Sequence, residues 1–347
     1  MPDHLLAPDP GPRVIRLESR YLITGGAGFI GSHLAEELLA GGDSVVALDN
    51  LSTGRLRNIE GLLDHPRFRF VHGSVLDELA VDEAVHEADV VVHLAAAVGV
   101  KLIVEHPLRS FTTNIRGSEV VLDAAHRYRR KILIASTSEI YGKAGGPLTE
   151  TTDRVIGTPS VARWAYSVAK SVDEILAFAY HKERGLPMVI VRLFNTVGPR
   201  QSPAYGMVVP RLVRQALAGE PLTVHGDGTQ TRCFCHVVDV VRAMVALLRD
   251  EHAEGEVYNV GSTEEVSINE LAARIIGRTG SESPIELVPY EDAYETGFED
   301  MQRRVPDITK LRSLVGWRPT YSLDEILDQT MAEAEMERNE SLLGYTC

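Results

Sequence analysis

The chain has 347 residues, 44% of them apolar and 24% charged, which is the composition of a folded globular protein with one large domain or two closely packed ones. The formal net charge of −14 argues against nucleic acid and against an anionic membrane surface as partners. No apolar run approaches the ~20 residues that a membrane-spanning helix requires, so we expect no membrane segment.

The N-terminal segment and the cysteines exclude further classes of protein. Residues 1–17 are rich in proline and lack a basic region followed by an apolar stretch, so we expect a disordered lead-in and no signal peptide. Cys233, Cys235 and Cys347 are odd in number and include a C-x-C pair, which supports neither a disulfide framework nor a zinc site. We therefore expect no metal and a cytoplasmic protein.

Short apolar strands alternate with helical patterns through the first half of the chain. The predicted strands are Tyr21–Thr24, Val45–Asp49, Phe68–Val71, Val90–Leu94, Lys131–Ser136 and Met188–Phe194. The predicted helices lie near Ser32–Ala40, Leu79–Glu87, Ser110–Tyr128 and Ala165–Arg184. This alternation predicts an α/β fold with a doubly wound parallel sheet, covered on both faces and with its active site at the carboxyl ends of the strands.

The pattern loosens after Gly198, where segments punctuated by proline and glycine suit a smaller, loop-rich substrate domain. A helix and strand at Val237–Leu248 and Val257–Val260 return to complete the first domain. We therefore predict a dinucleotide-binding domain of residues 18–194 plus about 235–261. The smaller mixed α/β domain would take about 195–234 plus 262–335.

A glycine-rich turn follows the first strand, in the run Y-L-I-T-G-G-A-G-F-I-G-S-H-L. Gly25 permits the tight turn, Gly28 lets backbone N–H groups approach a pyrophosphate, and Gly31 lets the following helix pack closely. Asp49, at the end of the second strand, would accept hydrogen bonds from the adenosine ribose and repel a 2′-phosphate. This order predicts a Rossmann fold that binds NAD rather than NADP; the alternative is an ordinary turn and an exposed aspartate.

Tyr166 and Lys170 stand four residues apart in W-A-Y-S-V-A-K, so both project from one face of a helix. A lysine ammonium favours the neighbouring phenolate, which makes the tyrosine a usable base near neutral pH. The strand before this helix ends in hydroxyls, and Thr137 would hold the oxygen whose proton Tyr166 takes. The alternatives are an ordinary surface pair and hydroxyls that serve only a turn.

Several further motifs stand in order along the chain: T-G-G-A-G-F-I-G, L-D-N-L-S-T-G, H-L-A-A, S-T-S-E-I-Y-G, Y-S-V-A-K, V-R-L-F-N-T-V-G-P and T-R-C-F-C-H-V-V-D-V. From about Tyr21 to about Thr330 the chain resembles the extended short-chain dehydrogenase/reductase family of nucleotide-sugar epimerases, dehydratases and decarboxylases. The resemblance implies an NAD that stays bound and is regenerated in each cycle. It also implies a UDP- or dTDP-sugar substrate and a homodimer formed through the helices near Asn114 and Tyr166.

The resemblance assigns residues to the cofactor by position. Lys170 would reach the nicotinamide ribose as well as Tyr166. One departure is Gly73-Ser74, where the family often has an aspartate for the adenine amine. The residues implied for NAD are Gly25, Gly28, Phe29, Ile30, Gly31, Asp49, Asn50, Ser52, Thr53, Gly54, Ser74, Val75, Leu94, Ala95, Ala96, Asn114, Tyr166 and Lys170.

The resemblance also implies a substrate site. Asn195 should contact the sugar diphosphate, Arg232 and Arg304 should hold the phosphates, and the run L-T-V-H that contains Val224 should border the uracil. The implied catalytic residues are Tyr166, Lys170 and Thr137. The implied substrate-binding residues are Ser138, Glu139, Arg192, Asn195, Val224, Arg232 and Arg304.

The branches of the family share a first step, in which Tyr166 takes the proton of the C4 hydroxyl while the C4 hydride passes to NAD. Ser138 replaces the aspartate of dehydratases, which argues against 4,6-dehydration. The run Thr137–Glu139 and P-S-V-A-R-W-A-Y-S resemble UDP-glucuronate decarboxylases. V-I-V-R-L-F-N-T-V-G-P-R-Q and C-F-C-H-V-V-D-V are closer to epimerases.

The carboxylate of a uronate substrate separates these two reactions. A 4-keto uronate is a β-keto acid, and it loses carbon dioxide only if the bond to its carboxylate lies parallel to the carbonyl π system. A guanidinium that pins the carboxylate near the ring plane would prevent this loss. Arg192 is our candidate, with Thr137 and Ser138 as helpers; the alternative is a structural arginine.

We therefore predict a UDP-sugar 4-epimerase that converts UDP-glucuronate to UDP-galacturonate through a transient 4-keto intermediate, with hydride returned from NADH. The alternatives are decarboxylation of UDP-glucuronate and 4-epimerisation of UDP-glucose. A non-enzymatic redox sensor on the same fold is a further alternative. It would not need the set of Thr137, Tyr166 and Lys170, and all three are present.

Overall fold

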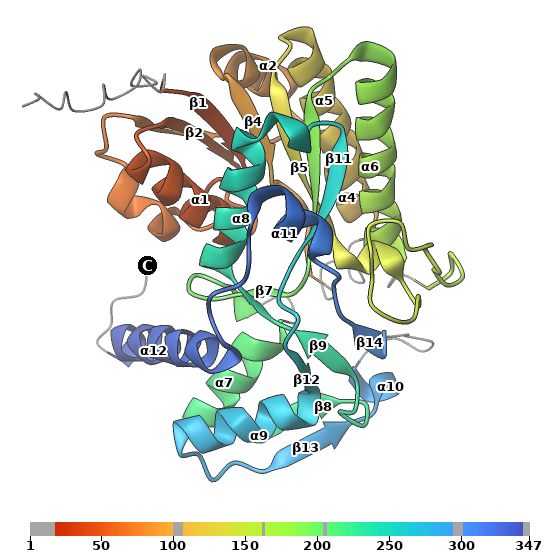
Figure 1. Ribbon diagram of the computed structural model, residues 1–347. Coiled ribbons are helices and arrows are strands. Elements are labelled where there is room, and N and C mark those ends of the chain that lie inside the picture. Colours follow the sequence, from red (N-terminus) through yellow and green to blue (C-terminus); the bar gives the residue numbers. More distant parts are fainter. Residues whose placement is uncertain (1–17, 100–106, 162–163, 204–206, 294–300, 343–347) are drawn as a thin grey trace, which may run out of the picture.

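The computed structural model describes residues 18–99, 107–161, 164–203, 207–293 and 301–342 (Figure 1). The lead-in predicted for residues 1–17 lies outside the described residues. In the described ranges, no helix combines the length and the apolar character that a membrane span needs.

A sheet of seven parallel strands forms the centre of the fold, in the order β11-β6-β5-β4-β1-β2-β3. Valine, isoleucine and leucine dominate these strands because helices cover the sheet on both faces. The predicted α/β fold is confirmed, and each predicted strand lies within one residue of its observed ends. The strands are β1 (Arg20–Thr24), β2 (Ser44–Asp49), β3 (Phe68–His72), β4 (Val90–His93), β5 (Lys131–Thr137), β6 (Met188–Leu193) and β11 (Glu256–Val260).

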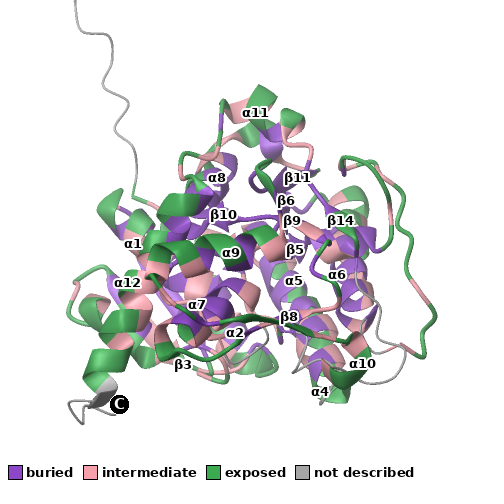
Figure 2. Cartoon of the chain, turned by 90° about the horizontal axis from the view of Figure 1, so that it is seen from below, coloured by how far each residue is buried: buried purple, intermediate pink, exposed green. Residues whose placement is uncertain are grey.

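Two layers of helices enclose the sheet, and each layer has its own apolar cluster. Figure 2 shows these buried residues inside a shell of exposed ones. One layer includes Leu34 and Val241, and the other includes Val85 and Ala177. The first layer consists of α1 (Phe29–Ala40), α8 (Val237–Arg249) and α11 (Thr309–Val315), and the second of α2 (Glu78–Glu87), α5 (Gly117–Arg127) and α6 (Ala165–Arg184).

The single helix predicted over Ser110–Tyr128 is interrupted in the structure. α4 (Pro107–Phe111) continues into a π-helical segment at Thr112–Arg116, and α5 begins only at Gly117. Short π-helical segments occur frequently at functional sites, and this one carries Asn114.

The remaining elements form a smaller mixed α/β unit, drawn below the large sheet in Figure 1. Its apolar cluster includes the fully buried Leu212, Leu271 and Leu327. The chain returns to the large sheet at β11, and the exact domain bounds stay a prediction. The elements of this unit are β7 (Thr196–Val197), α7 (Val208–Ala218), β8 (Leu222–His225), β9 (Thr231–Cys233), β10 (Cys235–His236), β12 (Glu265–Ser267), α9 (Ile268–Thr279), β13 (Ile285–Val288), α10 (Tyr290–Ala293), β14 (Arg303–Arg304) and α12 (Leu323–Leu342).

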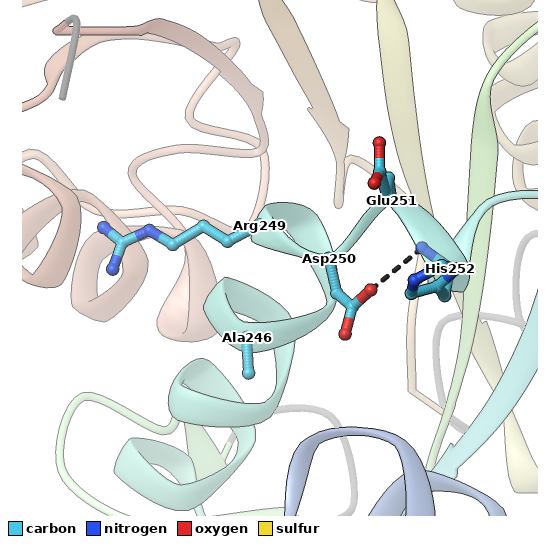
Figure 3. A pocket seen from close by; sticks show the side chains of 5 residues that line it. All are labelled: Ala246, Arg249, Asp250, Glu251 and His252. Atoms are coloured by element: carbon cyan, nitrogen blue, oxygen red, sulfur yellow. Dashed lines mark hydrogen bonds between the residues drawn. The ribbon is translucent and has the colours of Figure 1, made fainter. Parts of the chain in front are cut away.

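The strand order indicates where along the carboxyl ends of the strands a ligand site is expected. β1 lies between β2 and β4, so the order in which strands are added to the sheet reverses beside β1, and ligands of such sheets bind at the carboxyl ends of the strands at this point. A depression of about 450 Å³ lies elsewhere, at the end of α8 before β11, and therefore near the opposite edge (Figure 3). Its lining residues are Ala246, Arg249, Asp250, Glu251 and His252.

Candidate active site

The turn between β1 and α1 is packed so closely that only glycine fits at two of its positions. Gly25 has a φ of +73°, and a Cβ atom there would lie 2.9 Å from the backbone nitrogen of Ala95. A Cβ atom on Gly31 would clash with the carbonyl oxygen of Gly25. Gly28 is the N-cap of α1, and no described side chain caps this helix end. Its backbone N–H groups and positive dipole end therefore suit a pyrophosphate.

Asp49 lies buried at the end of β2, beside this turn. Its Oδ2 accepts a hydrogen bond from the backbone N–H of Ala27 at 3.0 Å, and its Oδ1 accepts one from Leu51 at 2.8 Å. A Cβ atom on Gly54 would lie 2.8 Å from Oδ2, so this glycine brings the loop after β2 against the carboxylate. Burial raises the pKa of Asp49, an effect that these backbone hydrogen bonds partly offset.

Loops after β1, β2, β3 and β4 meet at one edge because the four strands are parallel neighbours. These loops carry most of the residues predicted for NAD, and the individual contacts stay a prediction. Phe29 and Ile30 follow β1; Asn50, Ser52, Thr53 and Gly54 follow β2; Ser74 and Val75 follow β3; Leu94, Ala95 and Ala96 follow β4.

Asn114, predicted to contact NAD, holds the loop after β4. Its amide oxygen accepts a hydrogen bond from the backbone N–H of Ala97 at 2.7 Å, and its Nδ2 donates to the carbonyl oxygen of Ala97 at 3.2 Å. Nearby, the fully buried ring of His93 bonds to Thr24 and Ser118 at 2.8 and 3.1 Å. Burial lowers the pKa of His93 to about 3, so the ring is neutral. Asn114 thus shapes the predicted cofactor path through the backbone.

Tyr166 and Lys170 lie on the buried face of α6, which packs against β5 and the turn after it. Nζ of Lys170 donates a hydrogen bond to Oδ2 of Asp173 at 2.9 Å. The pKa of Tyr166 is raised, first by burial and then by the charges of Glu139 and Asp173. This direction is opposite to the predicted lowering by Lys170, whose ammonium is paired with Asp173.

The turn after β5 faces this helix. Oγ1 of Thr137 accepts a hydrogen bond from the backbone N–H of Glu139 at 3.2 Å and so caps a short helical turn over Ser138–Tyr141. Ser167, from α6, donates its hydroxyl to the carbonyl oxygen of Glu139 at 2.8 Å. Ser138 is buried in the same turn. The structure thus brings Thr137, Ser138 and Glu139 to the helix that carries Tyr166.

Two buried arginines lie side by side where β9 and β14 pair, because Arg304 is the register partner of Arg232. Nη2 of Arg304 donates to Oδ1 of Asn195 at 2.7 Å, and Nη1 lies 3.4 Å from Oε1 of Glu139. Nη1 of Arg232 donates to the carbonyl oxygen of Met301 at 2.7 Å. Adjacent guanidinium groups at this depth suit an anion such as a diphosphate. Arg304 also joins this cluster to the turn after β5.

Arg192, predicted to hold a substrate carboxylate, is fixed by the protein itself. Its Nε and Nη2 donate to the two carboxylate oxygens of Glu174 at 2.9 and 2.8 Å. Its Nη1 donates to the hydroxyl of Tyr141 and the carbonyl oxygen of Glu150, both at 2.9 Å. These bonds use four of the five N–H groups of a guanidinium that is 7% exposed. These bonds leave little of the guanidinium free for a substrate carboxylate, so the geometry favours the structural alternative.

Val224, predicted to border the uracil, turns its side chain into the core of the smaller unit. Along β8, Leu222 and Val224 are fully buried, whereas Thr223 and His225 are half-buried. Successive side chains of a strand point to opposite faces, so the outward positions belong to Thr223 and His225. A contact of Val224 with the uracil would therefore be made through its backbone, and the uracil border at Leu222–His225 stays a prediction.

The sequence reasoning missed Asp173 and Glu174, the carboxylates that pair with Lys170 and Arg192. A signal was present in K-S-V-D-E, because positions three and four residues after Lys170 lie on its own side of the helix. Two adjacent acids on the buried side of α6 each need a cationic partner, and these partners are Lys170 and Arg192.

A model of the protein family described as GDP-mannose 4,6 dehydratase matches residues 22–330. The chain belongs to this family of extended short-chain dehydrogenases/reductases. The predicted family is thus confirmed over almost the whole described chain.

Three similar proteins illustrate the branches of the family. The UDP-N-acetyl-alpha-D-glucosaminuronate decarboxylase of Bacillus cytotoxicus is 43% identical over 91% of this chain and 97% of its own length. UDP-glucuronic acid decarboxylase 1 of Danio rerio is 37% identical over 90% of this chain and 72% of its own length. The crystal structure of UDP-glucuronic acid 4-epimerase from Bacillus cereus, with UDP-glucuronic acid and NAD, matches with a TM-score of 0.83 at 31% identity, covering 92% and 99% of the two chains.

NAD is the cofactor of this protein, as predicted. The residues of the chain fit it: the N-terminus of α1 at Gly28 has no side-chain cap, the glycines let the turn pack closely around this helix end, and Asp49 stands beside that turn. Among the described residues, no group of three or more His, Cys, Asp or Glu side chains is arranged to hold a metal ion.

Proposed function

We propose that this protein decarboxylates a UDP-linked uronic acid through a 4-keto intermediate. The observation that carries the proposal is the carboxylate of Glu139, which lies near Tyr166 and pairs with Arg304. The Thr-Ser-Glu run at this turn and the two decarboxylase relatives support the same reaction. This choice reverses the order of the sequence prediction, in which 4-epimerisation came first.

The first chemical step uses residues of α6 and the turn after β5. When bound, NAD supplies the acceptor for the hydride of sugar carbon 4. Tyr166 takes the proton of the C4 hydroxyl, and Thr137 holds that oxygen. Lys170 stands one helical turn from Tyr166 as a buried cation. The product of this step is a 4-keto uronate.

The second step follows from the chemistry of a β-keto acid. The bond between C5 and C6 breaks, its electron pair moves into the C4 carbonyl as an enolate, and carbon dioxide leaves. A proton then adds to C5. The charge that was on the carboxylate has moved to the C4 oxygen, next to Tyr166, whose hydroxyl donates a hydrogen bond to it.

Glu139 favours this second step through its charge. A fixed carboxylate near the substrate carboxylate raises the energy of the bound acid, whereas neutral carbon dioxide feels no such repulsion. A guanidinium fixed on the substrate carboxylate would have the opposite effect. Arg192 does not provide one, because Glu174 holds it.

The second candidate is 4-epimerisation of UDP-glucuronate, and the solved 4-epimerase of Bacillus cereus supports it. It shares the C4 oxidation and the roles of Tyr166, Lys170 and Thr137. Without Arg192 as a clamp, this reaction needs another group to hold the substrate carboxylate near the ring plane.

We also propose that the protein forms a homodimer through α4 and α6. Their outer faces expose apolar side chains: Leu108 is 83% exposed, Ile175 57% and Phe178 37%. Isolated apolar residues on a surface are common, but these three lie on helices that pack against each other. Light scattering should give twice the chain mass for the wild type and the chain mass for Ile175→Glu. A monomeric wild type would overturn this proposal.

Product analysis by NMR tests the proposed reaction. The NAD-loaded protein is incubated separately with UDP-glucuronate, its 2-acetamido counterpart and UDP-glucose. We expect carbon dioxide and a UDP-pentose, or its 4-keto form, from a uronate. A galacto-configured uronate without carbon dioxide would select the epimerase, and conversion of UDP-glucose alone would overturn both uronate proposals.

Glu139→Gln separates the two steps of the mechanism. The amide keeps the shape of the side chain but removes its charge, so we expect carbon dioxide release to fall while C4 oxidation, seen as NADH absorbance, continues. Glu150→Gln is the matched control, because this acid lies outside the turn after β5. Unchanged carbon dioxide release in Glu139→Gln would contradict the role of Glu139.

A further inference from the structure

An ion pair that the mechanism above does not use lies directly behind the catalytic lysine. Nζ of Lys170 is 2.9 Å from Oδ2 of Asp173, and the two side chains are 3% and 0% exposed. Tyr166, Lys170 and Asp173 follow one another at spacings of four and three residues on α6. All three therefore share one side of the helix.

The second oxygen of this carboxylate is also notable. Oδ1 of Asp173 is buried and has no hydrogen-bond partner among the described residues. A buried carboxylate oxygen without a donor is unfavourable, so a merely structural acid at this position would be expected to have both oxygens satisfied. The bonded oxygen, Oδ2, contacts Lys170, so this ion pair is the polar contact that Asp173 makes in the described part of the chain.

Burial makes the pair consequential for Lys170. A lysine side chain is flexible, and its ammonium is strongly hydrated in water. Inside the protein, the carboxylate of Asp173 replaces that hydration and fixes the ammonium in one place. Removing one member of a buried pair leaves the other charge uncompensated.

The titratable groups around Tyr166 come from three elements. Lys170 and Asp173 lie on α6, Glu139 lies on the turn after β5, and His93 at the end of β4 is neutral because burial lowers its pKa to about 3. The charges of Glu139 and Asp173 add to burial in raising the pKa of Tyr166.

One more charged pair belongs to the same region. Glu174 follows Asp173 on α6, but its two oxygens are both bound by Arg192. Glu174 thus has both oxygens bound by one guanidinium. Asp173 bonds Lys170 through Oδ2 alone, and its charge contributes to raising the pKa of Tyr166.

We propose that Asp173 is a positioning residue, which holds the ammonium of Lys170 on the Tyr166 side of α6 and sets the charge around the catalytic tyrosine. The inference rests on the proposed role of Tyr166 as base, but not on the choice between decarboxylation and epimerisation. Both reactions begin with the same proton transfer at C4.

Two substitutions of Asp173 distinguish its effect on the position of Lys170 from the effect of its negative charge. Asp173→Asn keeps the shape and one acceptor for Lys170 but removes the negative charge. Asp173→Ala removes both. Asp82→Asn is the matched control, since this exposed-side acid of α2 bonds Arg127 and Tyr128, away from the site. The readouts are kcat/KM of the NAD-loaded enzyme from about pH 5.5 to about pH 10, and thermal unfolding at each pH.

Removing a negative charge near Tyr166 makes its phenolate easier to form. We therefore expect the acid limb of kcat/KM for Asp173→Asn to move to lower pH by about one unit or more, with kcat at its optimum within a few-fold of wild type. Asp173→Ala should lose ~10-fold or more in kcat with a smaller change in KM, because the ammonium is no longer held. The profile of Asp82→Asn should coincide with that of wild type.

An acid limb of Asp173→Asn that stays in place, or that moves to higher pH, would overturn the proposal even if the variant is less stable. The pH profile of Asp173→Asn tests the proposal by itself, so the test still works if Asp173→Ala fails to fold. Tyr166→Phe tests the proposed function on which this inference rests. If that variant turns over normally, Tyr166 is not the base. If Tyr166→Phe is inactive and the pH profile of kcat/KM for Asp173→Asn equals that of wild type, only the proposed role of Asp173 is wrong.

Discussion

Arg192 and Glu174 form a two-bond ion pair inside the protein, with Nε and Nη2 of the arginine on the two carboxylate oxygens of the glutamate. The pair joins β6 to α6 and lies behind the turn that carries Thr137. Ser136, the residue before Thr137, donates its hydroxyl to the same glutamate at 2.5 Å. The pair therefore supports the active-site wall rather than the substrate.

Arg192→Ala should destabilise the protein instead of changing its substrate preference. Removal of the guanidinium leaves Glu174 as a buried, uncompensated charge, which costs on the order of 3–5 kcal/mol in the free energy of unfolding. Urea unfolding measures this loss, and the double variant Arg192→Ala/Glu174→Gln should recover part of it. If Arg192→Ala is stable and loses affinity only for uronate substrates, the hypothesis that Arg192 binds the substrate carboxylate would be supported again.

Tyr166→Phe should keep NAD and substrate binding and lose turnover. Only the hydroxyl that exchanges the C4 proton is removed, and general-base catalysis typically contributes ~10²–10⁴-fold. The measurements are kcat, the NAD content of the purified protein and substrate affinity by calorimetry. Turnover within a few-fold of wild type would show that another group is the base.

Asp49→Asn should weaken the binding of NAD and allow NADP to compete for the same site. The amide still offers one acceptor to the backbone of the turn, but the charge that would repel a 2′-phosphate is gone. Affinities for both dinucleotides are measured on the cofactor-free protein, with the exposed Asp64→Asn as control. An unchanged ratio of the two affinities would contradict the ribose contact.

His93 should make the protein less stable in acid. The unfolded chain protonates this histidine near pH 6.5, whereas the folded protein keeps it neutral down to about pH 3. Between these values the unfolded state binds more protons, so the contribution of His93 is complete above pH 6.5 and is lost as the pH falls, at up to ~1.4 kcal/mol per pH unit.

His93→Gln tests this slope, because glutamine keeps hydrogen-bonding groups for Thr24 and Ser118 but does not titrate. Urea unfolding at a series of acidic pH values should show a smaller loss of stability in this variant than in wild type. His252→Gln, at an exposed position, should leave the slope unchanged. Equal slopes for wild type and His93→Gln would mean that other groups cause the acid sensitivity.

Local chemistry made much of the fold predictable from the chain alone. Apolar runs of four to seven residues have few conformations open to them when helices flank both ends, so the strands were predicted to within one residue. The π-helical segment around Asn114 was not predicted, because it spans only five residues between two helices and has no sequence signal of its own. Seen from the sequence, α4 and α5 are one helix.

The sequence by itself determined the family, the glycine turn and the helix that carries Tyr166 and Lys170, since these depend on neighbours within a few positions or on ordered motifs. Only the tertiary structure decided the partners of charged side chains. Arg192 and Glu174 stand 18 residues apart on different elements, and Glu139 and Arg304 stand 165 apart. A charge pairs with whatever the fold brings within a few ångströms, and linear spacing carries no record of that distance. For this reason Arg192 could be taken for a substrate ligand in the sequence and proved to be part of the scaffold.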